Sequence, residues 1–208
     1  MIKVLIADDH PIVRQGLKQI ISDSEDIAVT GEAATAQETL VGVAKNKFDV
    51  VLLDISMPGR SGIEIIKEIR EDPSNPAVLI LTSFPEEQYA VRALKSGASG
   101  YMVKRSAPDE LVTAIRKVST GGKYISSDLA ETLAFNLETG EIKPHEKLSN
   151  REYQVMCMIA SGITISGVAD KLSLSVKTIS THRSRILDKM GMKTNAELMH
   201  YAVKNSLA

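Results

Sequence analysis

Three carboxylates, one hydroxyl and one amine stand where apolar, strand-like runs of the sequence end. They belong to Asp8, Asp9, Asp54, Thr82 and Lys104. The runs that lead to them are short and rich in Val, Ile and Leu, which is typical of buried strands in a parallel sheet. Ligands bind such sheets beyond the carboxyl ends of the strands. The sequence therefore predicts that these five side chains gather at one edge of a sheet.

Grouped carboxylates repel each other, and two charges about 4 Å apart cost roughly 4 kcal/mol at an effective dielectric constant near 20. They stay ionised together only around a cation, and Mg²⁺ suits them because it prefers oxygen ligands in octahedral geometry. We expect Asp8 and Asp9 to hold the metal and Asp54 to accept a phosphoryl group as an acyl phosphate. Thr82 and Lys104 would then bind oxygen atoms of that group.

Each of these residues has an ordinary explanation when it is taken alone. An Asp after a strand is usually a turn or N-cap residue. A Lys in a loop is usually solvated, and a Thr is often only a strand residue. Matching chemistry at four strand ends favours the phosphoryl site over these explanations.

The elements that position these residues alternate along residues 1–122 as strand and helix patterns. Strands are expected at residues 2–7, 27–32, 50–53, 77–81 and 101–103. Helices are expected at residues 11–21, 35–44, 63–69, 86–95 and 108–118. This repetition predicts right-handed crossovers and an α/β fold with a doubly wound, five-stranded parallel sheet.

The pattern changes from residue 123 onward. A short helix is expected at residues 127–135, and the polar stretch 136–147, with Gly140 and Pro144, indicates a linker. Helix patterns without strand patterns follow at residues 150–160, 165–172, 176–190 and 196–204. A small all-α domain is therefore expected after the linker.

The composition is that of a soluble globular protein, with 43% hydrophobic and 25% charged residues among 208. We expect no membrane association, because no apolar run approaches the roughly 18 to 20 residues of a membrane helix. We also expect a cytoplasmic location, because the N-terminus shows no signal-peptide pattern. The single cysteine, Cys157, has apolar helical neighbours and is expected to be a buried, non-catalytic residue.

The net charge of −1 hides an asymmetry. Residues 1–146 hold 16 Lys and Arg against 22 Asp and Glu, whereas residues 147–208 hold 9 against 4. A basic half of this kind suggests nucleic acid as its partner.

Residues 1–122 resemble the receiver domain of two-component response regulators. The matching segments are 6–10, 53–59, 81–83 and 96–104. The resemblance implies a flavodoxin-like fold, phosphorylation of Asp54 by a histidine kinase, and a metal that is also bound by the backbone carbonyl of Ser56. It further implies that Thr82 moves toward the phosphoryl group and that Tyr101 turns inward behind it. His10 is expected to be a polar residue at the mouth of the site rather than a general base.

Residues 148–206 have the pattern of a helix-turn-helix domain. Ser149 and Glu152 have the spacing of a capping box, and Ser175 is expected to cap the helix at 176–190. An apolar stripe on that helix is expected to face inward, with Ile179, Ile186 and Met190. The outward residues are expected to be Lys177, Ser180, Thr181, His182, Ser184 and Arg185. This pattern fits a helix that enters the major groove of DNA and fits a solvated helix of a small bundle equally well.

The same region is similar to the LuxR-type DNA-binding domain of the NarL/FixJ subfamily of response regulators. The matching residues include Leu148, Arg151, Glu152, Gly162, Ala169, Leu172, Lys177, Thr178, His182, Ile186, Lys189 and Gly191. The resemblance implies DNA binding by Lys177, Thr178, Ser180, Thr181, His182, Ser184, Arg185 and Lys189. It also implies that the last helix pairs two such domains. Gly167 and Ser180 depart from the subfamily's usual residues, so no base-specific contact is assigned to any single residue.

The chain is thus expected to have a receiver domain at residues 1–122, a linker with a short helix at 123–146 and a DNA-binding domain at 147–208. Phosphorylation with Mg²⁺ would promote a homodimer that binds double-stranded DNA and regulates transcription, with a histidine kinase and RNA polymerase as protein partners. We do not expect an enzyme.

Two other functions remain open on the sequence. A Mg²⁺-dependent phosphatase with an Asp nucleophile would usually have a second acid two residues later, and Ser56 stands there instead. A constitutive DNA-binding protein, or a pure interaction module, would use the receiver only as a scaffold for dimerisation. Turnover of a small phosphoester would favour the first, and failure to incorporate phosphate would favour the second.

Overall fold

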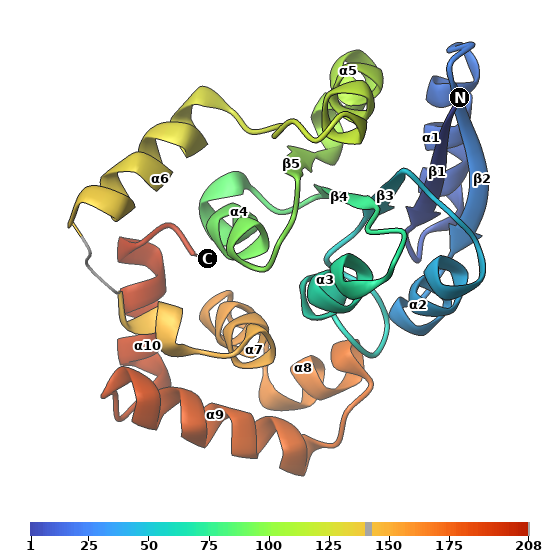
Figure 1. The fold of residues 1–208 in the computed structure, drawn as a ribbon. Coiled ribbons are helices and arrows are strands. Elements are labelled where there is room, and N and C mark those ends of the chain that lie inside the picture. The colour runs from blue at the N-terminus through green and yellow to red at the C-terminus, as the bar shows by residue number, and fades with distance from the viewer. Residues whose placement is uncertain (140–142, 208) are drawn as a thin grey trace. The chain divides into compact units, whose positions relative to one another are not determined.

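The computed structural model describes residues 1–139 and 143–207, without the side chains of residues 135–139. The chain divides into two compact units, Met1–Glu131 and Thr132–Ala208 (Figure 1). Among the described residues, none of the helices combines the length and hydropathy needed to span a membrane.

The described residues of the first unit form a five-stranded parallel sheet in the order β2-β1-β3-β4-β5. The strands are β1 (Ile2–Ala7), β2 (Ile27–Ala33), β3 (Val50–Leu53), β4 (Ala77–Thr82) and β5 (Gly100–Val103). All residues of β3 and β4 are buried, which explains their unbroken apolar sequences.

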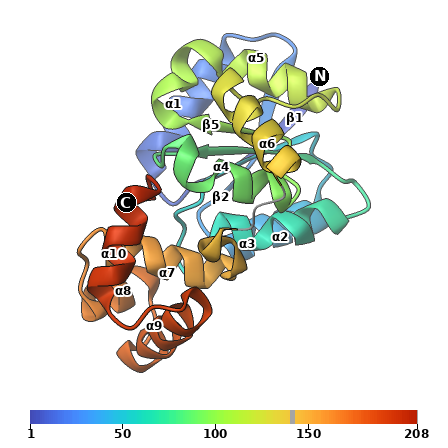
Figure 2. The same ribbon diagram turned by 90° about the vertical axis from the view of Figure 1, so that its left-hand side faces the viewer.

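The helices of this unit cover both faces of the sheet. They are α1 (Pro11–Ser22), α2 (Ala36–Lys45), α3 (Gly62–Glu71), α4 (Glu86–Lys95) and α5 (Ala107–Ser119). α1 packs beside α5, and α2, α3 and α4 pack in series on the other face (Figure 2). The predicted doubly wound α/β fold is confirmed.

The pairing of the strands brings their carboxyl ends to a common edge. Ala7 pairs with Leu53, and the Asp54 amide just beyond donates to the carbonyl of Ala7 at 2.9 Å. At the next two strands, Leu53 pairs with Ile80 and Thr82 pairs with Val103. Side chains that follow β1, β3, β4 and β5 therefore start from neighbouring points of one edge.

After residue 147 the described residues form four α-helices, as the sequence predicted. They are α7 (Asn150–Ala160), α8 (Ile165–Leu172), α9 (Val176–Met190) and α10 (Asn195–Lys204). The predicted capping box of Ser149 and Glu152 is present, and Ser175 accepts from the Thr178 amide at 3.0 Å. The helix boundaries thus follow the capping residues.

The predicted linker contains more regular structure than the sequence indicated. The expected helix at 127–135 continues as α6 (Ser127–Thr139), and Pro144–Lys147 form a short 3-10 helix, η2. Residues 140–142 of the predicted linker lie outside the described residues. The prediction relied on apolar periodicity, which a polar helix end lacks, and Pro144 suits the first turn of a helix.

The segment after α5 runs beside β5 as an additional edge. The amide of Tyr101 donates to the carbonyl of Tyr124, and the amide of Tyr124 donates to the carbonyl of Ser99, both at 3.0 Å. A Cβ atom on Gly100 would lie only 2.6 Å from the Tyr124 carbonyl oxygen. A glycine is therefore required for this close approach.

We expect Gly100→Ala to lower the free energy of unfolding by about 1–3 kcal/mol, because the added methyl group meets backbone that must shift. Urea unfolding measures this change. Gly16→Ala in α1 is the matched control, since a Cβ there would meet none of the described atoms within 4 Å, and it should stabilise by about 0.5–1 kcal/mol. Equal stability of Gly100→Ala and wild type would contradict the close approach.

Candidate functional site

The five residues singled out at strand ends do meet at one edge of the sheet. Asp8 and Asp9 follow β1, and Asp54 follows β3. Thr82 is the last residue of β4, and Lys104 is the first residue of a 3-10 turn, η1 (Lys104–Ser106), that follows β5. Asp8, Asp54 and Thr82 are buried. Burial strengthens electrostatic interactions between them.

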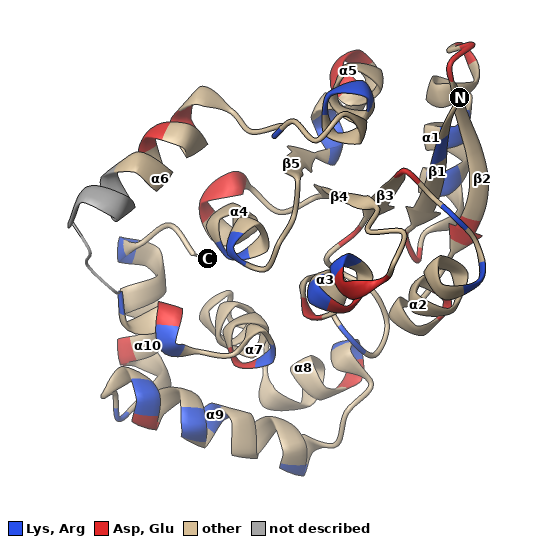
Figure 3. Ribbon diagram, viewed as in Figure 1, with Lys and Arg blue, Asp and Glu red and all other residues tan. Residues whose placement is uncertain are grey.

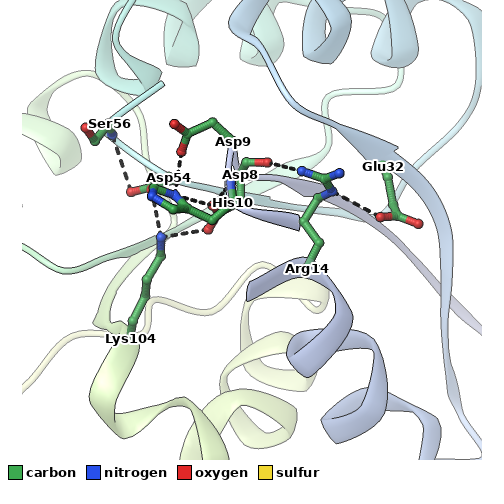
Figure 4. A network of polar contacts seen from close by, with 8 residues as sticks. All are labelled: Asp8, Asp9, His10, Arg14, Glu32, Asp54, Ser56 and Lys104. Carbon is green, nitrogen blue, oxygen red and sulfur yellow. Dashed lines mark hydrogen bonds and ion pairs between the residues drawn. The ribbon is translucent and has the colours of Figure 1, made fainter. Parts of the chain in front are cut away.

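Lys104 joins the two buried carboxylates. Its Nζ atom lies 2.7 Å from Asp8 Oδ2 and 2.7 Å from Asp54 Oδ2 (Figure 4). The other oxygen of Asp8, Oδ1, accepts from the His10 amide at 2.9 Å. One cation therefore holds two acids that would otherwise repel each other.

Burial and charge pull the pKa of Asp54 in opposite directions. Burial raises the pKa of this carboxyl, and the charge of Lys104 and hydrogen bonds from Lys104 and Thr82 lower it without cancelling the rise. Burial lowers the pKa of Lys104, but Asp54 and Asp8 outweigh burial and raise it. The ammonium of Lys104 therefore stays charged beside Asp54.

The acidic cluster is compatible with Mg²⁺. Asp8, Asp9, His10 and Asp54 each offer one ligand atom, and these atoms lie within 4.8 Å of one another. Asp9 Oδ1 is buried and has no hydrogen-bond partner among the described residues. Such an oxygen is suited to a hard divalent cation. The donors therefore fit the metal that the sequence implied.

His10 is an exposed residue at the mouth of the site, and its side chain also contacts Asp8 and Asp9. Its side chain is 63% exposed, as predicted, but Nδ1 lies 2.7 Å from Asp9 Oδ1 and 3.3 Å from Asp8 Oδ1. The contact with Asp9 has the distance of an ion pair without the geometry of a hydrogen bond, so it leaves Asp9 Oδ1 available to a stronger ligand.

Two further residues that the resemblance singled out, Ser56 and Tyr101, have defined hydrogen-bond partners. The Ser56 amide donates to Asp54 Oδ1 at 3.3 Å, and the metal-binding role of the Ser56 carbonyl stays a prediction. The Tyr101 side chain is buried, and its hydroxyl donates to the Phe84 carbonyl at 3.0 Å. The ring is thus turned inward, below the loop between β4 and α4.

Sequence reasoning missed a second cation near the acids, Arg14. Its guanidinium donates to the backbone carbonyl of Asp8 at 2.7 Å and to Glu32 Oε2 at 3.1 Å (Figure 4). The sequence pattern does not indicate this contact, because Glu32 lies in β2 and is brought next to Arg14 only by the tertiary fold.

In the second unit, α9 is the basic helix that follows the turn after α8, and Lys and Arg recur along it (Figure 3). Its predicted apolar stripe is buried, with Ile179, Ile186 and Met190. Six of the predicted DNA-binding residues are exposed along the helix: Lys177, Ser180, Thr181, Ser184, Arg185 and Lys189. These residues present short polar side chains and three basic side chains to solvent.

Thr178, Lys189 and His182 are engaged within the unit. Thr178 Oγ1 contacts Ser175 Oγ at 2.8 Å, and Lys189 Nζ lies 2.6 Å from Glu152 Oε2. The prediction that His182 points largely outward is wrong, because its side chain is half-buried. His182 stands three residues after Ile179 and four before Ile186, which places it at the border of the buried stripe.

The ion pair of Glu152 and Lys189 joins α7 to the end of α9. Burial raises the pKa of Glu152, but hydrogen bonds from Lys189 and from Ser149 lower it more, so the pKa lies below its usual value of 4.5. Since folding depresses this pKa, the stabilisation is present above about pH 4.5 and disappears as pH falls through the folded-state pKa.

Glu152→Gln should therefore destabilise the second unit at neutral pH and less so in acid, because only an ionised Glu152 binds Lys189 strongly. Urea unfolding at pH 7 and pH 4, followed by helix content, measures the difference between the variant and wild type. A difference that stays the same at both pH values would contradict this role of the carboxylate.

Family models match both units. Residues 4–116 match the model described as response regulator receiver domain. Residues 146–202 match the model described as bacterial regulatory proteins, luxR family.

Relatives align with nearly the whole chain. The response regulator UvrY of Escherichia coli is 37% identical over 209 residues, which cover 100% of this chain and 96% of UvrY. The solved structure of RcsB from Salmonella enterica bound to promoter rprA with phosphomimetic BeF3⁻ is 27% identical, with a TM-score of 0.66, and covers 96% of this chain and 97% of RcsB. A solved structure of two RcsB dimers bound to two parallel DNAs is 28% identical, with a TM-score of 0.59. The match covers 97% of this chain and 98% of the RcsB chain.

Proposed function

The chain belongs to the NarL/FixJ family of two-component response regulators, with a LuxR-type DNA-binding domain, and we propose that phosphorylation of Asp54 controls its binding to DNA. We propose a receiver at residues 1–122, a linker at 123–146 and a DNA-binding domain at 147–208. In support, the matched range 4–116 lies within the proposed receiver, and the matched range 146–202 starts one residue before the proposed DNA-binding domain.

The observation that carries this proposal is the bridge from Lys104 to Asp8 and Asp54, beside the buried Oδ1 atom of Asp9, which has no hydrogen-bond partner among the described residues. An Asp54 oxygen would attack the phosphorus of a phosphohistidine in a partner kinase. The new P–O bond replaces the P–N bond, and the histidine leaves. Lys104 and the Thr82 hydroxyl would each bind an oxygen of the acyl phosphate.

Asp8, Asp9, Asp54 and the Ser56 carbonyl would hold Mg²⁺ in this proposal. The metal would supply positive charge to the phosphoryl oxygens and so lower their repulsion from the acids. Asp8 is oriented for this role by Lys104 and the His10 amide, which take one oxygen each.

Phosphorylation adds about −1.5 to −2 charge and strong acceptor oxygens at Asp54. Thr82 would follow these oxygens, and the β4–α4 loop would move with it, since β4 ends at Thr82. Tyr101 donates to the Phe84 carbonyl in that loop, so the loop and the Tyr101 ring would change together. The altered surface would favour a homodimer.

The direct test is incubation of the whole chain with acetyl phosphate and Mg²⁺. We expect one phosphoryl group per chain, trapped by borohydride reduction and mapped by mass spectrometry to Asp54. Incorporation at another residue, or none in a folded protein, would contradict the proposal. Steady release of inorganic phosphate from small phosphoesters would favour an enzyme instead.

DNA binding is proposed for α9. The eight residues are Lys177, Thr178, Ser180, Thr181, His182, Ser184, Arg185 and Lys189. RcsB binds promoter DNA in its solved complex, and a basic helix after a tight turn supports the same mode here. Because Thr178 and Lys189 contact other side chains of the unit and His182 is half-buried, the remaining five are the stronger candidates. Two domains of a dimer would meet half-sites about 10 bp apart.

Lys177→Ala should weaken binding to DNA and reduce the salt slope of log K by about one, because each lost phosphate contact releases one fewer counterion. Fluorescence anisotropy with a promoter fragment between low and high salt measures the slope. Lys67→Ala is the matched control, because it removes the same charge from an exposed Lys in α3. Lys67 pairs with Glu71. Equal slopes for the two variants would count against the role of Lys177.

A histidine kinase is the proposed phosphodonor, because the chain has a receiver domain. RNA polymerase is the proposed downstream partner, and the cytoplasm is the proposed location. These proposals require neither turnover of a substrate nor contact with a membrane.

A further inference from the structure

Every polar group of Asp8 is held by a specific partner. Its amide donates to the Ala33 carbonyl at 3.0 Å, Oδ1 accepts from the His10 amide and Oδ2 pairs with Lys104. The fourth group, the backbone carbonyl, accepts from Arg14 Nη1 at 2.7 Å. Of the two cationic side chains among these partners, Lys104 takes part in the proposed phosphoryl chemistry and Arg14 does not.

The carbonyl of Asp8 needs such a partner because the strand ends before it. β1 stops at Ala7, so this carbonyl is beyond the regular ladder. It belongs to the peptide that joins Asp8 to Asp9, and the orientation of that peptide sets the direction of both side chains. Arg14 approaches it from the side of Asp8 opposite Lys104 (Figure 4).

Arg14 is itself fixed by an acid on the neighbouring strand. Its Nε donates to Glu32 Oε2 at 3.1 Å, and Lys18 Nζ donates to Glu32 Oε1 at 2.8 Å. Hydrogen bonds from Lys18 and Arg14 lower the pKa of Glu32, so it stays ionised near neutral pH. The Arg14 side chain is only 17% exposed, and two of its guanidinium nitrogens, Nε and Nη1, have partners.

We propose that Arg14, held by Glu32, is a positioning residue that fixes the Asp8–Asp9 peptide and so aims both carboxylates at the cation site. This inference rests on the proposed function, because it assumes that the two acids bind Mg²⁺. Arg14 touches neither the metal nor the phosphoryl group in this scheme.

A role of Arg14 through its charge and a role in positioning predict opposite changes in Mg²⁺ affinity when Arg14 is replaced. If Arg14 acted only through its charge, Arg14→Gln would remove a cation near the acids and tighten Mg²⁺ binding. If Arg14 positions the peptide, the same variant weakens Mg²⁺ binding about tenfold, as loss of a group that orients metal ligands commonly does. Arg14→Lys keeps the charge but lacks the fork, so it should lie between Arg14→Gln and wild type.

The experiment is calorimetric titration of the whole unphosphorylated chain with MgCl₂. Arg116→Gln is the matched control, because Arg116 also forms a two-bond pair with an acid, Asp26, away from the site, and its Mg²⁺ affinity should equal that of wild type. An Arg14→Gln protein that binds Mg²⁺ as tightly as wild type, or more tightly, would overturn the inference. If Arg14→Gln does not fold, Arg14→Lys decides in the same way.

The same titration tests the proposed metal site and the proposed role of Arg14 separately. Wild-type protein that binds no Mg²⁺ would contradict the proposed metal site itself. Wild-type protein that binds Mg²⁺ beside variants of equal affinity would contradict only the role of Arg14.

Discussion

Asp54→Ala is expected to abolish the gain in dimerisation that acetyl phosphate and Mg²⁺ give the wild-type chain. Asp54 is the proposed acceptor, so the variant cannot acquire the charge that would draw Thr82 and Lys104 inward. Coupling between two sites commonly changes affinity by about 5–150-fold. We therefore expect the wild-type dimer to tighten at least about tenfold and the variant dimer to stay unchanged, as measured by sedimentation velocity over a concentration series.

Asp54→Asn is the control for effects of the cavity that Ala leaves. Its amide oxygen can still accept from Lys104, which now bonds Asp54 Oδ2 at 2.7 Å, but it cannot form an acyl phosphate under the same treatment. The two variants should behave alike. Phosphodonor-induced dimerisation in either variant would show that another residue carries the switch.

Asp9→Asn is expected to weaken Mg²⁺ binding about a hundredfold and to stabilise the metal-free protein by about 1 kcal/mol. Asp9 Oδ1 is buried, and in the described part of the chain it has no hydrogen-bond partner and only the 2.7 Å contact with the largely exposed His10, so little is lost when its charge is removed. Repulsion from Asp8 and Asp54 is relieved at the same time. Calorimetric titration with MgCl₂ and urea unfolding without metal measure the two effects.

Glu71→Gln is the matched control, because it removes one exposed negative charge in α3 and leaves the sheet edge intact. Neither its Mg²⁺ affinity nor its stability should change by more than about 0.5 kcal/mol. If Asp9→Asn destabilises the metal-free protein, then the Asp9 carboxylate does not lower the stability of that protein. The assignment of Asp9 as a metal ligand would then lose its main support.

The sheet edge could be predicted from the sequence because its geometry follows from topology. Parallel strands that alternate with helices must bring their carboxyl ends together. The positions of the strand ends were therefore enough to predict that Asp8, Asp54, Thr82 and Lys104 meet. The capping residues Ser149 and Ser175 were equally local signals, and the structure shows both as caps.

Contacts between elements distant in sequence could not be predicted in this way. Lys189 and Glu152 are 37 residues apart, and Arg14 and Glu32 are 18 apart. Each pair depends on how two elements pack, which hydrophobic periodicity does not report. His182 was misjudged for a related reason, since the edge of a buried stripe depends on the neighbouring helices.

The central claim is that phosphorylation of Asp54 controls DNA binding, and one comparison tests it most directly. Wild-type and Asp54→Ala chains are both treated with acetyl phosphate and Mg²⁺, incubated with sheared genomic DNA, and the captured fragments are sequenced. We predict that wild type enriches a discrete set of sites and that Asp54→Ala occupies these sites at least about tenfold less. Equal occupancy of the same sites by both proteins would contradict the claim.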